Sequence, residues 1–520
     1  MFLQNFASSL MLAIPLLLLF SASASRITPR WQLSQTVNAL VLVASLAIAA
    51  IAFIINFTYG GVEWNPWSWI NQSLIAPVML VLVTFIGLII TRYSRNYLAG
   101  EPNQNRYLRQ LQFTLAAVSI VILSNHLLVL LSAWVMISLG LHDLLMFYSN
   151  RTRAVLAAHK KFLFARISEV SLLISFVLLY AQHDTWIISE IVAAYPVESL
   201  SAIEQWAAVF LALTALLKCA QIPAHGWLMQ VMEAPTPVSA LLHAGVVNLG
   251  GYLLLLFAPL LMLSSSAQWL LLIVAGLTMG LASLVMMTRV SIKVRLAWST
   301  SAQMALMLIE CALGLFELAL LHLLAHSCYK AYAFLNSGSA AKEDVSRQLA
   351  PSVLSKRSTW ITAAIVATGL ILIPMLLIDT QGPFSPWLIM GAAITLLLAE
   401  RSSQSRLEKL TSVLPLATIF ISAYVIQKYA AGYLVTPLEP SAGWLADAWV
   451  ISLFVLLFCV YWVLLYFPQS LLAKRFAISL FAGFYLDEWT TRTTQRIWPV
   501  KLPTRANAKQ LQTFSEEISR

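Results

Sequence analysis

The stretch LLKCAQIPAHGWLMQVMEAPTPVSALLHAG, from Leu216 to Gly245, places ionisable residues and three prolines inside a strongly apolar chain. Lys218 ends the apolar run WAAVFLALTALLK, and Pro223 follows five residues later. Proline removes a backbone donor and interrupts a helix. Within a membrane, the freed backbone groups are tolerated only inside protein or beside a water-filled cavity. The stretch therefore predicts a broken membrane helix with Lys218 at the break.

Lys218 has two interpretations. Ionisable side chains at membrane depth usually line pathways or pair with one another, and a lysine hydrated by the cavity at a break can load and unload a proton. Alternatively, Lys218 extends to the membrane interface and has no part in transport. The second interpretation does not explain the broken helix, so we favour the first.

The composition is that of a membrane protein. Of 520 residues, 60% are hydrophobic and only 10% are charged, whereas soluble domains carry about 25% charged residues. Apolar stretches of about 20 residues recur, each sufficient to cross a bilayer as a helix. Short alternating strands typical of membrane barrels are absent from the sequence. We predict an all-α polytopic protein of about 15 transmembrane helices, in which LMLAIPLLLLFSASAS is a retained first helix.

The charges of the connections alternate along the chain and predict its orientation. Basic connections follow the positive-inside rule, which places them in the cytoplasm. The contrast is clear between the third and sixth connections, which hold Arg92, Arg95, Arg106 and Arg109 in one case and Asp184, Glu190, Glu198 and Glu204 in the other. An odd number of helices then puts the N-terminus outside and the C-terminus in the cytoplasm, in a bacterial inner membrane.

Four segments are expected in this order. They are N-terminal transmembrane helices over 1–110, a translocation core over 111–339, C-terminal transmembrane helices over 340–470 and a cytoplasmic tail over 471–520. The sequence shows no Gly-rich nucleotide loop, and its four cysteines have no metal-binding spacing. We therefore expect no cofactor in this chain.

A second polar group lies in HLLAHSCYK. His322, His326 and Lys330 are spaced at i, i+4 and i+8, which places them along one face of a helix. Histidine titrates near neutral pH, so the stripe suits a proton relay. Histidines at i and i+4 also occur in zinc sites, but no acid or thiolate follows at a motif spacing. His243 in SALLHAG is either a relay member or a buried core histidine.

These stretches, together with SIKVRLAWSTSAQMALM, resemble the antiporter-like subunits of respiratory NADH dehydrogenase (its subunit 5) and of Mrp-type sodium/proton antiporters. The resemblance is strong over about 111–339. It implies that Lys218 is the central proton-carrying residue, that His243 is the bridging histidine, and that His322, His326 and Lys330 belong to the internal relay.

The sequence departs from this family in the fifth helix. The family has a glutamate directly after a tryptophan there, paired with the broken-helix lysine, whereas SAWVMISLGLHDLLMFY has Val135. His142 and Asp143 lie about two turns further on, along a similar face. We predict that they replace the missing partner; if they do not, Glu169 or Glu233 is the next candidate.

Within the family, MEAPTPVSALLHAGVVNLGG and GFYLDEWTTRTTQRIWPVKLP resemble the membrane subunit of DAB-type inorganic-carbon uptake systems. That resemblance implies a large cytoplasmic zinc protein, similar to a carbonic anhydrase, as partner. Ion flow (H⁺ or Na⁺) through this chain would drive CO2 hydration in the partner, and the chain itself would be no enzyme. The alternatives are a proton-pumping subunit of a respiratory or hydrogenase-type complex and an Mrp-type antiporter subunit. Tail aromatics and arginines predict that the tail docks the partner.

Overall fold

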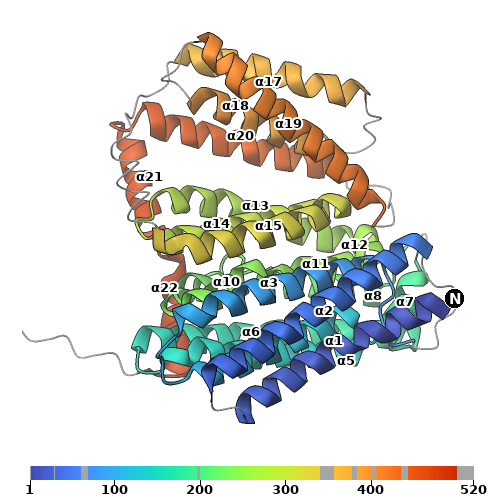
Figure 1. Ribbon diagram of the computed structural model, residues 1–520. Helices are drawn as coiled ribbons and strands as arrows, with labels where there is room; N and C mark the ends of the chain where they lie inside the picture. The colour runs from blue at the N-terminus through green and yellow to red at the C-terminus, as the bar shows by residue number, and fades with distance from the viewer. Residues whose placement is uncertain are drawn as a thin grey trace, which may run out of the picture.

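The computed structural model describes residues 2–27, 30–59, 68–195, 199–339, 357–377, 383–400, 406–434 and 443–500. Over these ranges the chain is helical and forms no strand, only isolated bridges. Nine of the described helices are long and apolar enough to cross a membrane, and shorter apolar helices accompany them. Figure 1 shows most of the helices lying side by side along one direction. The expected all-α polytopic fold is confirmed.

The larger layer contains the N-terminal and central helices, which share one apolar core. Its elements are α1 (Phe2–Ile27), α2 (Trp31–Tyr59), α3 (Ile75–Tyr97), α4 (Gln104–Leu123), α5 (Leu127–Leu145), α6 (Thr152–His183), α7 (Ile188–Ala193), α8 (Ala202–Lys218), α9 (Gly226–Gln230), α10 (Thr236–Ala244), α11 (Leu249–Leu256), α12 (Ala258–Leu263), α13 (Ser265–Met287), α14 (Ile292–Ala312) and α15 (Phe316–Leu335).

A second layer lies above α13, α14 and α15 in Figure 1 and has its own smaller core. It consists of α17 (Arg357–Leu377), α18 (Ser385–Glu400), α19 (Arg406–Gly432) and α20 (Trp444–Tyr466). The layers meet where α20 packs on α13. There, Trp449 Nε1 donates to the backbone oxygen of Leu272 at 3.2 Å, and Gly276 leaves room for Leu453.

Serines bring α6 and α8 together at close range. Ser171 Oγ donates to the backbone oxygen of Phe210 at 2.8 Å, and Ser175 Oγ donates to that of Ala207 at 2.8 Å. Small residues and serine hydroxyls are the usual means by which membrane helices approach closely, since apolar side chains gain nothing by leaving lipid. This contact fixes the two helices that carry Glu169 and Lys218.

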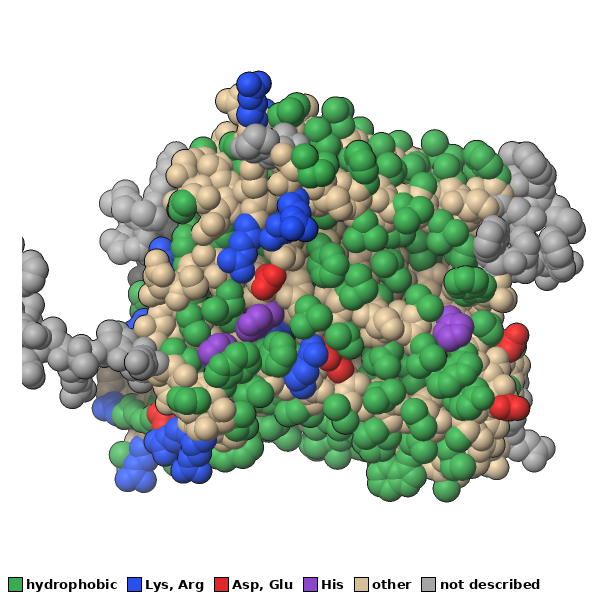
Figure 2. All heavy atoms as spheres, turned by 90° about the horizontal axis from the view of Figure 1, so that it is seen from below, with side chains coloured by type: hydrophobic (Ala, Val, Ile, Leu, Met, Phe, Trp, Pro, Cys, Tyr) green, Lys and Arg blue, Asp and Glu red, His purple; other side chains and the backbone are tan. Residues whose placement is uncertain are grey.

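The basic side chains gather toward one end of the helix bundle. Figure 2 shows Lys and Arg in one half of a largely apolar face, with some Asp and Glu among them, whereas the acidic side chains at the other end have no described Lys or Arg beside them on this face. We call the first the basic end; it holds the last turn of α3 and the first turns of α6 and α14. The acidic end holds the last turn of α6, the helix α7 and the first turn of α20. The N-terminus lies at the acidic end (Figure 1).

The last helices of the described residues cross the basic end. We call residues 471–498 the strap; it consists of α21 (Leu471–Phe481), a turn and α22 (Leu486–Ile497). Figure 1 shows both helices running across the direction of the others. In the turn, Gly483, Phe484 and Tyr485 all have left-handed φ angles of 61°, 52° and 54°. Each non-glycine residue in that conformation costs roughly 1–2 kcal/mol of conformational free energy. The packing of α21 and α22 on either side of the turn must therefore hold it in place.

Candidate ion-translocation site

The helix that begins at Ala202 stops at Lys218, as the sequence predicts. The freed backbone groups after Lys218 find partners on two neighbouring helices. Thr278 of α13 accepts from the Ile222 amide at 3.1 Å, and Ser301 of α14 donates to the Ala220 oxygen at 3.1 Å. Non-helical backbone at membrane depth survives only with such partners. The break is therefore a built feature that holds Lys218 at the end of α8.

Lys218 lines a small cavity with Glu169 and Lys161 of α6 and with Trp134 of α5. The cavity volume is about 20 Å³, and a polar cavity of about 10–15 Å³ suffices for one water molecule. Lys218 Nζ lies 4.4 Å from the centre of the Trp134 ring, so the ring face supports the ammonium. The cavity thus joins a partly buried lysine, a buried carboxylate and space for one bridging water.

Two further cations, Arg166 and Lys161, lie beside Lys218 and Glu169. We call these four residues the first cluster. Arg166 donates to Glu169 Oε1 at 2.8 Å and to Ser138 Oγ at 2.8 Å. Lys161 Nζ donates to the backbone oxygen of Ser138 at 2.7 Å and is 5% exposed. Among the described residues that line the cavity, Glu169 is the carboxylate, and Lys161 and Lys218 are the cations.

The second cluster lies on α15 and joins α14. Lys330 Nζ donates to the Leu296 oxygen at 3.2 Å and contacts Ser299 Oγ. At the other end of the stripe, His322 Nδ1 lies 3.1 Å from Glu310 Oε2. Between them His326 is 4% exposed, and neither of its ring nitrogens has a hydrogen-bond partner among the described residues. The stripe therefore has an unpaired imidazole in its middle and an acid at its end.

A cavity of about 690 Å³ runs along this second cluster. It lies between α14 and α15 on one side and α18, α19 and α20 on the other, and its lining includes Glu310, His322, His326, Lys330 and Tyr424. Water filling such a space would connect Lys330 with His322 by side chains and solvent. The stripe runs from near the basic end toward the acidic end, along the direction of α15.

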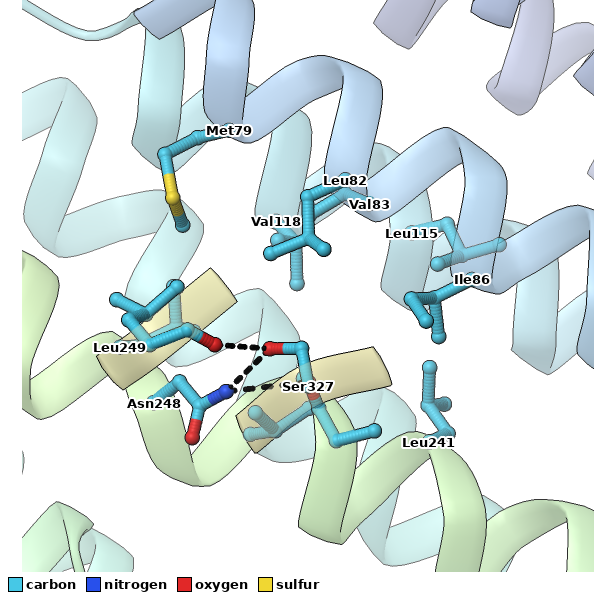
Figure 3. Close-up of a pocket in the computed structure, with 14 residues that line it drawn as sticks. Met79, Leu82, Val83, Ile86, Leu115, Val118, Leu241, Asn248, Leu249 and Ser327 are labelled. Carbon is cyan, nitrogen blue, oxygen red and sulfur yellow. Dashed lines mark hydrogen bonds between the residues drawn. The ribbon is translucent and has the colours of Figure 1, made fainter. Parts of the chain in front are cut away.

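His243 lies between the clusters. Its Nδ1 is 3.0 Å from Thr300 Oγ1, its ring stacks on Phe334 at 4.4 Å, and it is close enough to interact electrostatically with Lys330. Just beyond the interruption at Gly245, Asn248 donates to Ser327 Oγ at 2.7 Å. Figure 3 shows this pair beside an apolar pocket between α3, α4, α10, α11 and α15. The bond ties the broken α10–α11 helix to the stripe on α15.

Asp143 and His142 lie elsewhere. Asp143 accepts from Gln110 at 2.7 Å and lies 3.9 Å from Arg106, with its side chain 42% exposed. His142 stacks among aromatic rings, including Trp498 of the strap. Neither lines the Lys218 cavity, because two turns along α5 carry them toward the basic end. The acid that lines the Lys218 cavity is Glu169. A role for Asp143 and His142 in ion movement stays a prediction.

Sequence reasoning missed part of both clusters. Lys161 follows the basic residues Arg151 and Arg153 closely and was not singled out, but α6 already begins at Thr152 and buries it. Its spacing of eight residues from Glu169 on one long helix is the signal that would have found it. Glu310 gave no signal near HLLAHSCYK, because α14 brings it to His322 from twelve residues upstream. Within the described ranges, no group of three or more potential metal-ligating side chains forms.

The sequence was compared with known proteins. Residues 124–396 match the family described as "NADH:quinone oxidoreductase/Mrp antiporter, TM", and residues 73–108 match "NADH-Ubiquinone oxidoreductase (complex I), chain 5 N-terminus". The chain is 47% identical to the "Probable inorganic carbon transporter subunit DabB" of Hydrogenovibrio crunogenus over 99% of both chains. It is 31% identical to the "NADH-quinone oxidoreductase subunit L" of Escherichia coli over 60% of this chain and 54% of that protein.

Among solved structures, a chain of the Mrp complex from Dietzia superposes with a TM-score of 0.61 at 20% identity. The superposition covers 98% of the present chain and 62% of the Mrp chain. At this identity the match shows a shared fold. It extends over the two helix layers and their broken helices.

Proposed function

The chain belongs to the family of NADH:quinone oxidoreductase and Mrp antiporter membrane subunits, in the branch of the inorganic carbon transporter subunits DabB, and from this premise we propose that it translocates H⁺ or Na⁺ within an inorganic-carbon uptake complex. Ion flow would drive CO2 hydration in a cytoplasmic, zinc-binding partner similar to a carbonic anhydrase (DabA type). This chain is the transporting subunit, and the hydration chemistry belongs to the partner.

One observation carries the translocation proposal. At the break after α8, Lys218 and Glu169 share a cavity large enough for a water. Placing an ionisable side chain at membrane depth costs several kcal/mol of free energy, so such residues usually have a function. His243 and the α15 stripe extend the polar groups toward the acidic end. Together these groups suit two half-pathways, one from each end of the bundle, that meet between Lys218 and Lys330.

The membrane orientation is part of the proposal. The basic end holds the arginines of the short connections, and the positive-inside rule places such connections in the cytoplasm. The N-terminus lies at the acidic end, which would face outward, and the strap would lie on the cytoplasmic surface (Figure 1). Ions would then enter or leave the cytoplasm near the strap.

The partner distinguishes this function from its alternatives. Purification in mild detergent, followed by mass spectrometry and metal analysis, should recover one large zinc-containing protein in a fixed ratio. Several redox subunits would instead place the chain in a respiratory or hydrogenase-type complex. A set of small membrane subunits would place it in an Mrp-type antiporter. Either result would overturn the carbon-uptake proposal while leaving ion translocation in place.

The histidine stripe gives a prediction of its own. Replacing His326 by alanine should lower ion translocation roughly tenfold, because it removes the titratable group between Lys330 and His322. The zinc content of the purified complex should stay unchanged. The measurement pairs proton uptake into vesicles with metal analysis of the same preparation. His183→Ala at the acidic end is the matched control, since His183 contacts Tyr195 and Glu204 outside both clusters.

A stoichiometric loss of zinc in His326→Ala would make His326 a metal ligand and contradict the relay. Unchanged uptake with unchanged zinc would make His326 a buried core residue.

Some of the tail aromatics that could dock the partner are buried against the rest of this chain, and others are exposed. Part of the predicted docking tail packs on its own chain: Trp498 stacks on His159 at 3.8 Å, and Phe484 contacts Phe476. Tyr485 and Trp489 remain outward, 67% and 69% exposed. The charged connection from Lys342 to Arg357 is the next candidate for docking the partner if the tail does not. It falls almost wholly outside the described residues, as does the tail beyond residue 500.

We expect Tyr485→Ser combined with Trp489→Ser to release the partner. Interface aromatics of this kind contribute about 2 kcal/mol each when they are central to a contact, so the partner should largely dissociate during purification. Trp444→Ser, at the acidic end and 77% exposed, is the matched control. Retention of the partner at full occupancy in the double variant would move the docking surface to the cytoplasmic loops. Lipid contact would be the remaining role of these aromatics.

A further inference from the structure

The strap brings an acid to a buried lysine at the basic end. Asp487 Oδ1 accepts from Lys160 Nζ at 2.7 Å, although 327 positions separate the two residues. The Lys160 side chain is fully buried, whereas that of Asp487 is 32% exposed. Thr491 Oγ1 also accepts from Lys160 at 2.7 Å. The carboxylate of Asp487 therefore stands between solvent and an ammonium that has no other contact with water.

The site is shaped to receive this carboxylate. Gly226, the first residue of α9, faces Asp487 so closely that a Cβ there would lie 1.4 Å from Oδ1. Gln230, one turn later on α9, donates to Asp487 Oδ2 at 2.8 Å. Thr490 Oγ1 donates to Oδ1 within the strap at 2.9 Å. Four side chains and a glycine from three helices thus fix one carboxylate.

An unpaired histidine lies next to this group. His225 is 1% exposed, and neither ring nitrogen has a hydrogen-bond partner in the described part of the chain. It interacts electrostatically with both Asp487 and Lys160. Two residues later, Trp227 lines the Lys218 cavity. On the neighbouring helix, Lys160 is followed directly by Lys161, which lines the same cavity. The residues around Asp487 are thus next to the first cluster on two helices, through Trp227 near His225 and through Lys161 beside Lys160.

We propose that Asp487, Lys160 and His225 form the basic-end entrance of the ion pathway, with Asp487 as the group that exchanges with water. This inference rests on the proposed translocation function and specifies its ion at the entrance. The ammonium of Lys160 would repel a metal cation beside Asp487, so the group handles protons. Asp487 takes a proton from water as Lys160 releases one inward to His225. The proton of Asp487 then restores Lys160, and both groups return to their starting charges.

The test measures proton uptake by the purified complex in vesicles under an imposed pH gradient, with a pH-sensitive dye inside. Asp487→Asn keeps the shape and one acceptor oxygen for Lys160, although its amide nitrogen cannot accept from Gln230. The amide cannot carry a proton. We expect uptake to fall at least about fivefold. Thr494→Val is the matched control, because Thr494 is buried on the same helix but bonds only to its own backbone at Thr490. It should conduct like the wild type.

A double variant separates an entrance from a purely structural ion pair. Removing one partner of a buried pair leaves an unpaired charge, and removing both often restores stability. If the pair merely fastens the strap, Lys160→Met with Asp487→Asn should recover proton uptake. If the residues conduct, uptake stays low while thermal stability recovers. Recovered uptake overturns the proposal.

The variant His225→Gln tests the entrance without disturbing the fold, since it leaves the Lys160–Asp487 pair intact. It should lower proton uptake at unchanged thermal stability, and wild-type uptake would remove His225 from the entrance. Lys218→Met serves as the reference for the translocation function. If Asp487→Asn conducts normally and Lys218→Met does not, only the entrance is wrong. If the wild type itself takes up no protons, both the entrance and the proton as its ion are overturned.

Discussion

Replacing Lys218 by methionine is expected to abolish ion translocation and carbon-dependent growth at ambient CO2 while the protein remains in the membrane. Methionine keeps the apolar stem and the contact with Trp134, and it removes only the ammonium. A positioned proton-transfer group contributes roughly 10²- to 10⁴-fold to a rate, so translocation should fall by at least about a hundredfold. The measurements are growth, proton uptake in vesicles and the abundance of the protein in membranes.

Two further variants sharpen this test. Lys218→Arg should fail as well, because guanidinium cannot release its proton at physiological pH. Lys474→Met is the matched control, since Lys474 is an exposed residue of the strap. Growth of Lys218→Met at ambient CO2 like the wild type would refute the central role of Lys218. The lysine would then be a structural cation held on the Trp134 ring.

Replacing Glu169 by glutamine is expected to have the second largest effect, a loss of about tenfold or more, equivalent to about 1.4 kcal/mol or more in the barrier. Glutamine retains the shape and a hydrogen-bond acceptor for Arg166, but it loses the negative charge. Lys161 and Lys218 would then line the cavity without a carboxylate, and Arg166 would lose its ion pair. Proton uptake in vesicles measures the effect, and membrane abundance shows whether the variant folds.

Asp143→Asn is the informative comparison, because it makes the same change in an acid that the sequence favoured. Asp143 is partly exposed and interacts with Arg106 and Gln110. From the geometry we expect Glu169→Gln to impair uptake more strongly than Asp143→Asn. The reverse order would assign the partner role to Asp143, acting from the basic end, and would leave Glu169 as a structural partner of Arg166.

The sequence was informative wherever a local rule applies. Hydropathy located the expected helices, proline spacing located the break at Lys218, and the i, i+4, i+8 rule placed three polar residues on one face of α15. These features depend on residues that are near one another in the chain. Lys160 and Lys161 were not singled out, because they closely follow the basic residues Arg151 and Arg153 in the sequence.

The features that escaped prediction come from distant segments. Glu169 reaches Lys218 because serines hold α6 against α8, and Glu310 reaches His322 because α14 and α15 are antiparallel neighbours. No spacing within one helix encodes either contact. Asp143 was favoured because it lies on the same helix as the position of the missing glutamate. The acid that lines the Lys218 cavity lies instead on the neighbouring helix, α6.

The long separation between Lys160 and Asp487 has a consequence for biosynthesis. Ribosomes make the chain from its N-terminus, so α6 is inserted long before the carboxylate that serves it has been translated. Until then Lys160 lacks its acid, and a buried unpaired charge is strongly destabilising. Seating of α22 is therefore a late step of maturation. A nascent chain that stalls before Leu486 would still carry Lys160 without its acid at the basic end.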